Sequence, residues 1–265
     1  MHFKSATGFA ISAIVLTIAG CSSQSDVPSV HAAGPTGVKN VLLVHGAWAD
    51  GSSWDLVTAN LNADGYNVTA VQLPLTSLSD DAATLQRALA RENGKTILVA
   101  HSYGGVVITQ AGNDPKVAGL VYISAYAPDN GESAGFLDTT EPSTPIANDL
   151  QLDSNGFLTI SSTGVATDFA PDLTPAQQVT IAATQGPTSL NGDLMGTVTQ
   201  VAWKSLPSWY SISSNDRVIS PALEASMAKR MNATTITLQS GHLAMLSHPT
   251  EVSNLIETAA TSLQP

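Results

Sequence analysis

Short apolar runs recur along the chain from Asn40 onward, and stretches with apolar residues at helical spacing separate them. A short, continuous apolar run is typical of a strand that is covered on both faces, as in a parallel sheet. The pattern therefore predicts strands at residues 41–44, 67–71, 96–100, 117–123, 209–212 and 234–238.

Helical periodicity fills most of the gaps between these runs. The predicted helices are residues 54–63, 81–91, 103–111, 223–231 and 252–263. Strands and helices that alternate with short connections predict an α/β fold with a doubly wound, mostly parallel sheet.

The alternation is interrupted at residues 128–207, where Gly, Pro, Ser, Thr and Asp are frequent. Residues 153–156 predict a turn between two short strands. Residues 174–177 have the capping-box arrangement, with proline at the first helical position, that starts a helix. An insertion of this size between two core strands predicts a cap over the functional site.

The start of the chain is predicted to be a targeting segment. Lys4 precedes an apolar stretch at residues 9–18, which is too short to span a bilayer comfortably. Residues 18–21, Ile-Ala-Gly-Cys, resemble the lipobox of bacterial lipoproteins. Residues 1–20 are therefore predicted to be a lipoprotein signal peptide that is cut before Cys21, whose thiol would be acylated.

Cys21 is the chain's only cysteine, so no intramolecular disulfide can form, and lipidation would explain an unpaired thiol in an exported protein. Two or three acyl chains hold a protein stably on a membrane. Residues 21–39 are predicted to be a flexible tether to a domain at 40–265.

The predicted location is the bacterial cell envelope, and Ser22 resembles the residue after the cysteine in outer-membrane lipoproteins. The alternative is a secreted or periplasmic protein that is cut near residues 30–32.

Composition narrows the classes of partner. Of 265 residues, 43% are hydrophobic and 12% are charged, which allows a sizeable core and excludes a disordered chain. The formal net charge is -11, and no run of basic residues occurs. Nucleic acid is excluded as a partner because phosphate contacts need a basic surface.

Residues 100–105, Ala-His-Ser-Tyr-Gly-Gly, lie where a predicted strand turns directly into a predicted helix. This is the context of a nucleophile elbow, with Ala100 in the first glycine position of G-x-S-x-G. Such a turn strains the backbone of the serine and needs small residues on either side. Ser102 is therefore predicted to be a nucleophile, placed at the positive end of the following helix.

A serine hydroxyl needs a base to remove its proton. Two of the six histidines fall in the signal peptide and the tether. His45, before a glycine, and His248, before a proline at a helix start, favour a structural and a capping role. His101 adjoins the serine, but the sharp turn points successive side chains apart. His242 lies in the loop after the last predicted strand, at the sheet edge where the serine lies, and is predicted to be the base.

A third group must orient the imidazole and stabilise its protonated form. Asp216 follows the predicted strand 209–212, and it gives the chain order of serine, acid and histidine that is common in this type of sheet. Asp129, after the strand 117–123, is the alternative acid. A solvated Asp216 paired with Arg217 is the alternative to a catalytic role.

The developing negative charge on a substrate oxygen needs fixed donors, and backbone N–H groups serve this purpose best. The N–H of Tyr103, the residue after the nucleophile, is predicted to be one donor. The N–H of Ala47, in the loop after the first strand, is predicted to be the other, since Gly46 permits a tight backbone path. Trp48 could line the pocket or face the core.

These segments resemble those of bacterial α/β-hydrolases that are related to plant methyl-ester hydrolases and hydroxynitrile lyases. The similarity extends over residues 40–263 and is carried by residues 44–48, Gly51, Trp54, 65–71, 100–105, 208–210 and 241–249. The resemblance implies an α/β-hydrolase fold with a cap, and a serine hydrolase that cleaves small-molecule carboxylic esters. It implies no metal or organic cofactor.

Two departures bear on the reaction. Hydroxynitrile lyases of this family have a lysine after the catalytic histidine and replace the glycine of the oxyanion loop, whereas this chain has Leu243 and Gly46. The resemblance therefore implies ester hydrolysis through an acyl-enzyme. The alternatives are lyase or perhydrolase activity on the same triad, and a binding lipoprotein that hydrolyses nothing.

Four cap aromatics could line an apolar pocket or form the core of the cap: Phe136, Phe157, Phe169 and Trp203.

Overall fold

Six parallel strands form the central sheet of a computed structural model that describes residues 36–264. The strand order is β2-β1-β3-β4-β8-β9, and each neighbouring pair is parallel. The doubly wound, mostly parallel sheet predicted from the sequence is confirmed. The strands are β1 (Asn40–Val44), β2 (Asn67–Val71), β3 (Thr96–Ser102), β4 (Val117–Ala125), β8 (Ser208–Ser213) and β9 (Thr234–Leu238).

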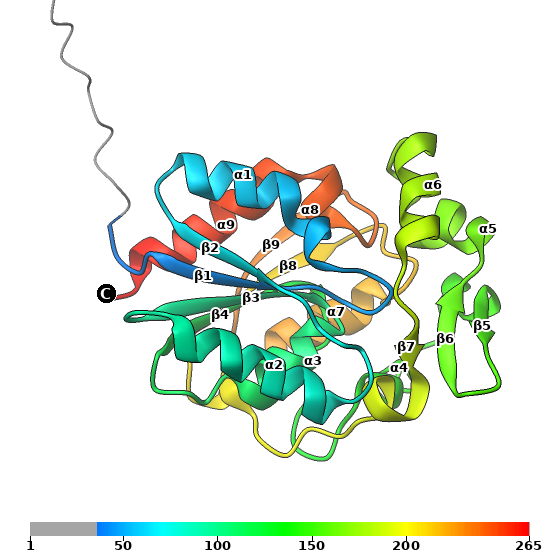
Figure 1. Ribbon diagram of the computed structural model, residues 1–265, viewed down its shortest axis with the longest axis horizontal. Helices are drawn as coiled ribbons and strands as arrows, with labels where there is room; N and C mark the ends of the chain where they lie inside the picture. The colour runs from blue at the N-terminus through cyan, green and yellow to red at the C-terminus, as the bar shows by residue number, and fades with distance from the viewer. Residues whose placement is uncertain (1–35, 265) are drawn as a thin grey trace, which may run out of the picture. The chain divides into compact units, whose positions relative to one another are not determined.

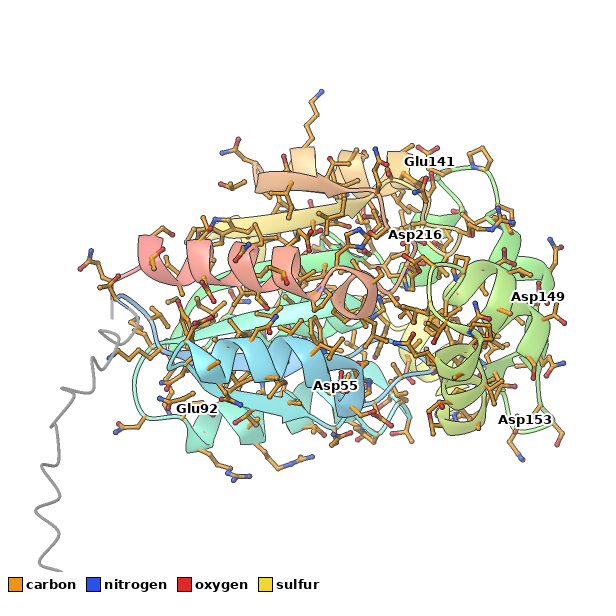
Figure 2. The ribbon with its side chains drawn as sticks, turned by 90° about the horizontal axis from the view of Figure 1, so that it is seen from above. Asp55, Glu92, Glu141, Asp149, Asp153 and Asp216 are labelled. Atoms are coloured by element: carbon orange, nitrogen blue, oxygen red, sulfur yellow. The ribbon has the colours of Figure 1, made fainter. Side chains whose placement is uncertain are left out.

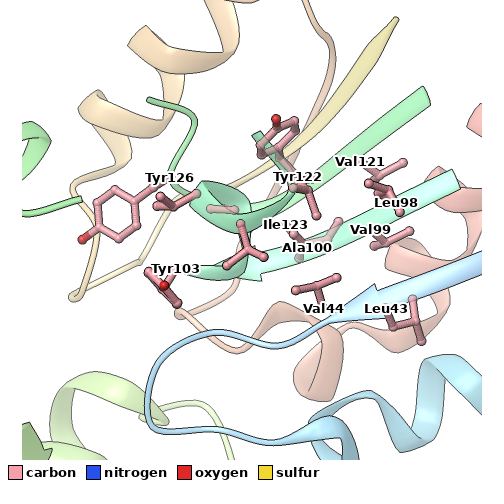
Figure 3. Packing of buried hydrophobic residues seen from close by; sticks show 14 of the residues in the cluster. Leu43, Val44, Leu98, Val99, Ala100, Tyr103, Val121, Tyr122, Ile123 and Tyr126 are labelled. Atoms are coloured by element: carbon pink, nitrogen blue, oxygen red, sulfur yellow. The ribbon is translucent and has the colours of Figure 1, made fainter. Parts of the chain in front are cut away.

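Helices cover both faces of this sheet. The helices α1 (Asp55–Ala63) and α9 (Pro249–Ser262) contact each other on one face, and α2 (Leu78–Arg91) contacts α3 (Gly104–Ala111) on the other (Figure 1). Every residue of the central strands β1 and β3 is buried. Figure 3 shows side chains of β1, β3 and β4 packed together in this core. The remaining elements of this part are η1 (Gly51–Trp54), α7 (Pro221–Arg230) and α8 (Ala244–Ser247).

Residues 128–207, the predicted cap, connect β4 to β8; most of this segment lies beyond the carboxyl ends of the strands, and its last part returns along α3 to the start of β8 (Figure 1). The turn at residues 153–156 joins two antiparallel strands, and Thr174 starts a helix with both bonds of a capping box. The helices of the cap are α4 (Ala134–Asp138), η2 (Pro145–Asn148), α5 (Ser162–Gly164), η3 (Val165–Phe169), α6 (Pro175–Thr184), η4 (Leu190–Leu194) and η5 (Ala202–Lys204). Its three-stranded sheet is β5 (Leu150–Leu152), β6 (Phe157–Ile160) and β7 (Thr188–Ser189).

The folded domain begins before residue 40. Val38 is buried, and its N–H donates to the Ala260 carbonyl of α9 at 3.1 Å. Gly37 has a φ of +83°, and a Cβ at this position would collide with the same carbonyl. The predicted signal peptide at 1–20, the lipidation residue Cys21 and most of the predicted tether lie outside the described residues. Within residues 36–264, no helix has the length and apolarity to cross a membrane.

Candidate active site

Ser102 ends β3 with a φ of 52°, in the left-handed region that non-glycine residues rarely occupy. Two glycines make this turn possible. A Cβ on Gly46 would lie 2.7 Å from the Ser102 Cβ, and one on Gly104 would lie 2.6 Å from the His45 carbonyl oxygen. The strained serine is therefore held where two loop backbones approach it closely, as in a nucleophile elbow.

The loops after β8 and β9 bring an aspartate and a histidine together. His242 Nδ1 donates to Asp216 Oδ2 at 2.6 Å, and both side chains are completely buried. The other oxygen of Asp216 accepts the N–H groups of Val218 at 2.7 Å and Ile219 at 3.0 Å. Figure 2 shows Asp216 at the edge of the sheet that faces the cap. These bonds fix the carboxylate, which in turn fixes the imidazole ring and its tautomer.

The second imidazole nitrogen of this histidine is unused. Within the described residues, His242 Nε2 has no hydrogen-bond partner, and Ser102 Oγ does not bond to it. With its proton on Nδ1, His242 presents a free lone pair at Nε2. Catalytic hydrogen bonds of this kind are often long without substrate and tighten when it binds.

Asp129, the alternative acid, lies elsewhere. Its carboxylate pairs with Lys204 Nζ, and 31% of its side chain is exposed. Arg217 pairs with Asp168 at 2.6 Å and not with Asp216. Of the two acids considered, only Asp216 contacts the histidine.

His101 and His45 hold the loops of the site. His101 Nε2 donates to the His242 carbonyl at 3.0 Å, and the two ring centroids are 4.5 Å apart. His45 Nε2 accepts the Leu73 N–H at 2.9 Å, and its Nδ1 donates to the Gly46 carbonyl. Burial lowers the pKa of both imidazoles, that of His101 far below its usual range, so both are neutral. Sequence reasoning placed His101 away from the serine and missed its contact with His242.

His248 does not have the capping role expected of it. Its ring bonds to the Ser247 hydroxyl at 2.9 Å, and its side chain makes no cap hydrogen bond with α9. Pro249 occupies the first turn of that helix and lacks an N–H, so one of the donors that a cap would satisfy is absent.

Glu224 of α7 is a further acidic group at the site, and it lies completely buried beside Asp216. One of its oxygens accepts the Ser213 N–H at 3.0 Å. Burial and the nearby charge of Asp216 raise the pKa of Glu224 well above its usual range. Nothing in the sequence signalled this residue, because a glutamate in a helix usually faces solvent.

The N–H groups of Ala47 and Tyr103, the predicted oxyanion donors, have no partner within the domain. Neither the Ala47 nor the Tyr103 N–H donates to another atom of residues 36–264. Both residues line the same cavity as Ser102.

Cavities lie between the cap and the sheet, and one of about 480 Å³ is lined by Pro171 and Asp172 of the cap and by Asp216. The cavity that contains Ser102, here called the serine cavity, has a volume of about 440 Å³. A second cavity of about 380 Å³ lies between α6 and η1, and Leu243 lines it. Trp48 lines both, with a φ of 58° and an indole N–H that donates to the Leu158 carbonyl. Trp48 is buried in the hydrophobic core and also borders both cavities, so it combines the two interpretations left open by the sequence.

The four cap aromatics have different surroundings. Phe169 lines the second cavity, and its ring lies 5.5 Å from that of His242. Trp203 is buried and donates to the Pro128 carbonyl, and Phe136 is 49% exposed. Phe136, Phe157 and Trp203 line neither cavity, so only Phe169 has the lining role considered for all four.

Beneath the elbow, Tyr103 connects the core to the cap. Its hydroxyl lies 2.9 Å from an oxygen of Asp81 in α2 and 3.2 Å from one of Asp193 in η4. Both carboxyls are completely buried. Burial, and then the charge of Asp81, raises the pKa of Asp193 to about 7. The Tyr103 hydroxyl has one proton and can donate it to only one of the two carboxyl groups. A further proton, bound by Asp81 or Asp193, allows both carboxyl groups to take part in hydrogen bonds.

A comparison with protein families matches residues 41–255 to the model of the alpha/beta hydrolase family. The chain belongs to this family. Methyl jasmonate esterase 1 of Vitis vinifera is 26% identical over 81% of this chain and 94% of its own length. An alpha/beta hydrolase of Aspergillus novofumigatus, nvfD, is 25% identical over 83% of this chain and 96% of its own. This chain is thus similar to esterases, and its relation to plant methylesterases is confirmed.

Solved structures agree on the fold. The crystal structure of polyneuridine aldehyde esterase superimposes with a TM-score of 0.74, at 20% identity over 84% of this chain and 99% of that chain. At this identity the likeness shows the fold alone.

Proposed function

We propose that this α/β-hydrolase cleaves carboxylic esters in two acyl-transfer steps, with Ser102 as nucleophile, His242 as base and Asp216 as the orienting acid. The observation that carries the proposal is the buried bond between His242 Nδ1 and Asp216, which leaves Nε2 free to accept a proton. The strained backbone of Ser102 at the same sheet edge supports it.

In the first step, Ser102 Oγ forms a bond to the ester carbonyl carbon while His242 Nε2 takes its proton. The N–H groups of Ala47 and Tyr103 bind the oxygen that becomes negative. His242 then returns the proton to the leaving alcohol as the ester C–O bond breaks. Water attacks the acyl-enzyme with the same proton transfers and releases the acid.

Lyase chemistry on the same residues is less well supported. Leu243 follows the histidine, and its apolar side chain is buried. Among the described residues that line the serine cavity, none is Lys, Arg or His. A cleavage that expels an anionic carbon or cyanide would find no positive group there, whereas hydrolysis needs only the N–H donors and the histidine.

Labelling with a fluorophosphonate probe tests the proposal and separates an enzyme from a binding protein. The parent should be labelled on Ser102 and should hydrolyse short 4-nitrophenyl esters. Ser102→Ala and His242→Ala should each lose most of this activity, and the double variant should be little worse than either single variant, because the residues act as a unit. Labelling elsewhere, or activity that persists in Ser102→Ala, would contradict the assignment.

A further inference from the structure

The wall of the serine cavity combines apolar side chains with two carboxyl groups. Much of its wall is apolar and comes from the cap, for example Leu158 and Leu194, and from Leu223 of α7. Two carboxyl groups, Asp138 and Glu141, also line it. Because no basic residue of the described chain lines this cavity, its wall carries only negative charge.

Asp138 is held in place by Tyr126, the residue that follows β4. Tyr126 donates its N–H to the Ser102 carbonyl at 3.1 Å. Its side chain is buried, and its hydroxyl donates to Asp138 Oδ1 at 2.8 Å. Figure 3 shows Tyr126 beyond the strand ends, near Tyr103. The carboxyl is thus connected through one residue to the backbone of the nucleophile.

The second oxygen of Asp138 is available to a ligand. Within residues 36–264, Oδ2 makes no hydrogen bond and no basic side chain pairs with this carboxyl. Asp216 and His242, from the loops after β8 and β9, also lie in its surroundings. The Asp138 side chain is open to the cavity and to solvent. A carboxylate with no cationic partner of its own attracts a positive group that comes within a few ångströms.

We propose that Asp138, positioned by Tyr126, selects esters that carry an ammonium group in the part of the substrate that fills the serine cavity. This inference rests on the proposed ester hydrolysis and specifies its substrate class as cationic and otherwise apolar esters. The ammonium group would lie against Asp138 while the ester carbonyl lies at Ser102, and an anionic ester would be disfavoured at the same wall.

Matched pairs of esters test this inference. In the first pair, 4-nitrophenyl esters have acyl chains of equal length that end in trimethylammonium or in tert-butyl. In the second, butanoate esters have alcohol chains with the same two ends. The two ends are similar in shape and differ in charge. The parent should prefer the cation at least about fivefold in kcat/KM in one pair, which is the scale expected of a partly shielded ion pair.

Asp138→Asn removes the charge and keeps an acceptor for the Tyr126 hydroxyl, so the preference should fall to about one while the tert-butyl ester is still hydrolysed. Asp129→Asn is the matched control, since it removes a carboxylate outside the cavity and should leave the preference unchanged.

Burial raises the pKa of Asp138 to about 6. In the parent the preference should therefore disappear as the pH falls through about 6, and in Asp138→Asn it should show no such step.

The ratio of the two rates within a pair cancels every effect of pH on the catalytic steps that both esters share. No preference in either pair, or a preference that survives in Asp138→Asn, would overturn the inference and leave ester hydrolysis intact. Hydrolysis of none of the four esters would instead overturn the proposed function on which the inference rests.

Discussion

At the scale of single residues, the position of Ser102 depends on the absence of side chains around it. A methyl group on Gly46 would lie 2.7 Å from the Ser102 Cβ and 3.0 Å from His101 Nδ1. Both distances are shorter than an ordinary contact, and neither neighbour can move without displacing the elbow or the loop of His242.

Gly46→Ala should therefore destabilise the fold by about 1–3 kcal/mol, the usual cost of overpacking, and lower kcat by at least about tenfold. Urea unfolding and steady-state kinetics measure the two effects. Gly186→Ala is the control, because a Cβ there meets only Leu75 Cδ1, at 3.6 Å. Equal behaviour of the two variants would mean that the elbow tolerates the methyl group.

The bond between Asp216 and His242 permits a second prediction at this scale. Asp216→Asn should lower kcat by about a thousandfold or more, because an amide favours the wrong imidazole tautomer. Asp129→Asn should change kcat little, since Asp129 pairs with Lys204. Kinetics of the two variants on one ester give the comparison, and a reversed result would place the acid after β4.

At the scale of elements, the cap is joined to the core through the carboxyls of Asp81 and Asp193. The pKa of Asp193 is about 7 in the folded chain, against an ordinary value of 3.8. Between these values the folded state binds a proton that the unfolded state has released. The stabilisation by this proton is therefore complete below about pH 4 and is lost as the pH rises towards 7.

Asp193→Asn removes the carboxyl group that binds this proton in the folded state. In the parent the free energy of unfolding should include a term that falls with pH by up to about 1.4 kcal/mol per unit between about pH 4 and 7. In Asp193→Asn this term should be missing, which urea unfolding at several pH values can measure. Asp55→Asn, which removes an exposed carboxylate from α1, should keep the slope of the parent (Figure 2). An unchanged slope in Asp193→Asn would mean that the pair holds no proton.

The elements that the sequence predicted are those with a strong local pattern. The predicted strands at 41–44 and 96–100 are short, largely apolar runs that helices cover on both faces of the sheet, and Thr174 marks a helix start through its own side chain. The two-residue strand β7 and the irregular helices η3 and η4 have no such pattern, because their conformation depends on contacts with distant parts of the cap.

The candidate site shows the same division. Ser102, Asp216 and His242 were predictable because each follows a strand, and strand ends meet at one edge of the sheet. Glu224, His101 and Asp138 were not, because their importance comes from neighbours distant in the sequence: Asp216, the His242 carbonyl and the Tyr126 hydroxyl.

At the scale of the whole molecule, we propose that the protein is anchored through lipid on Cys21, as the sequence indicates. Cys21→Ser removes the thiol that accepts lipid, so the protein should no longer partition into detergent, while ester hydrolysis per molecule should be unchanged. Mass spectrometry of the mature N-terminus measures the modification. An unmodified N-terminus at Ala33 would indicate ordinary secretion and would rule out the anchor.

The contact of Val38 with Ala260 determines from which end the domain can be held. Val38 precedes β1, and the end of α9 lies at the amino ends of the strands, away from the cap (Figure 1). A Cβ on Gly37 would also lie 2.9 Å from the Leu263 carbonyl oxygen. Any attachment through residue 36 or residue 264 therefore pulls on the end of the sheet that is remote from Ser102. Immobilised on a bead or a sensor chip by either end, the enzyme would turn the cap towards the solution, and substrate would reach the serine cavity without passing the support.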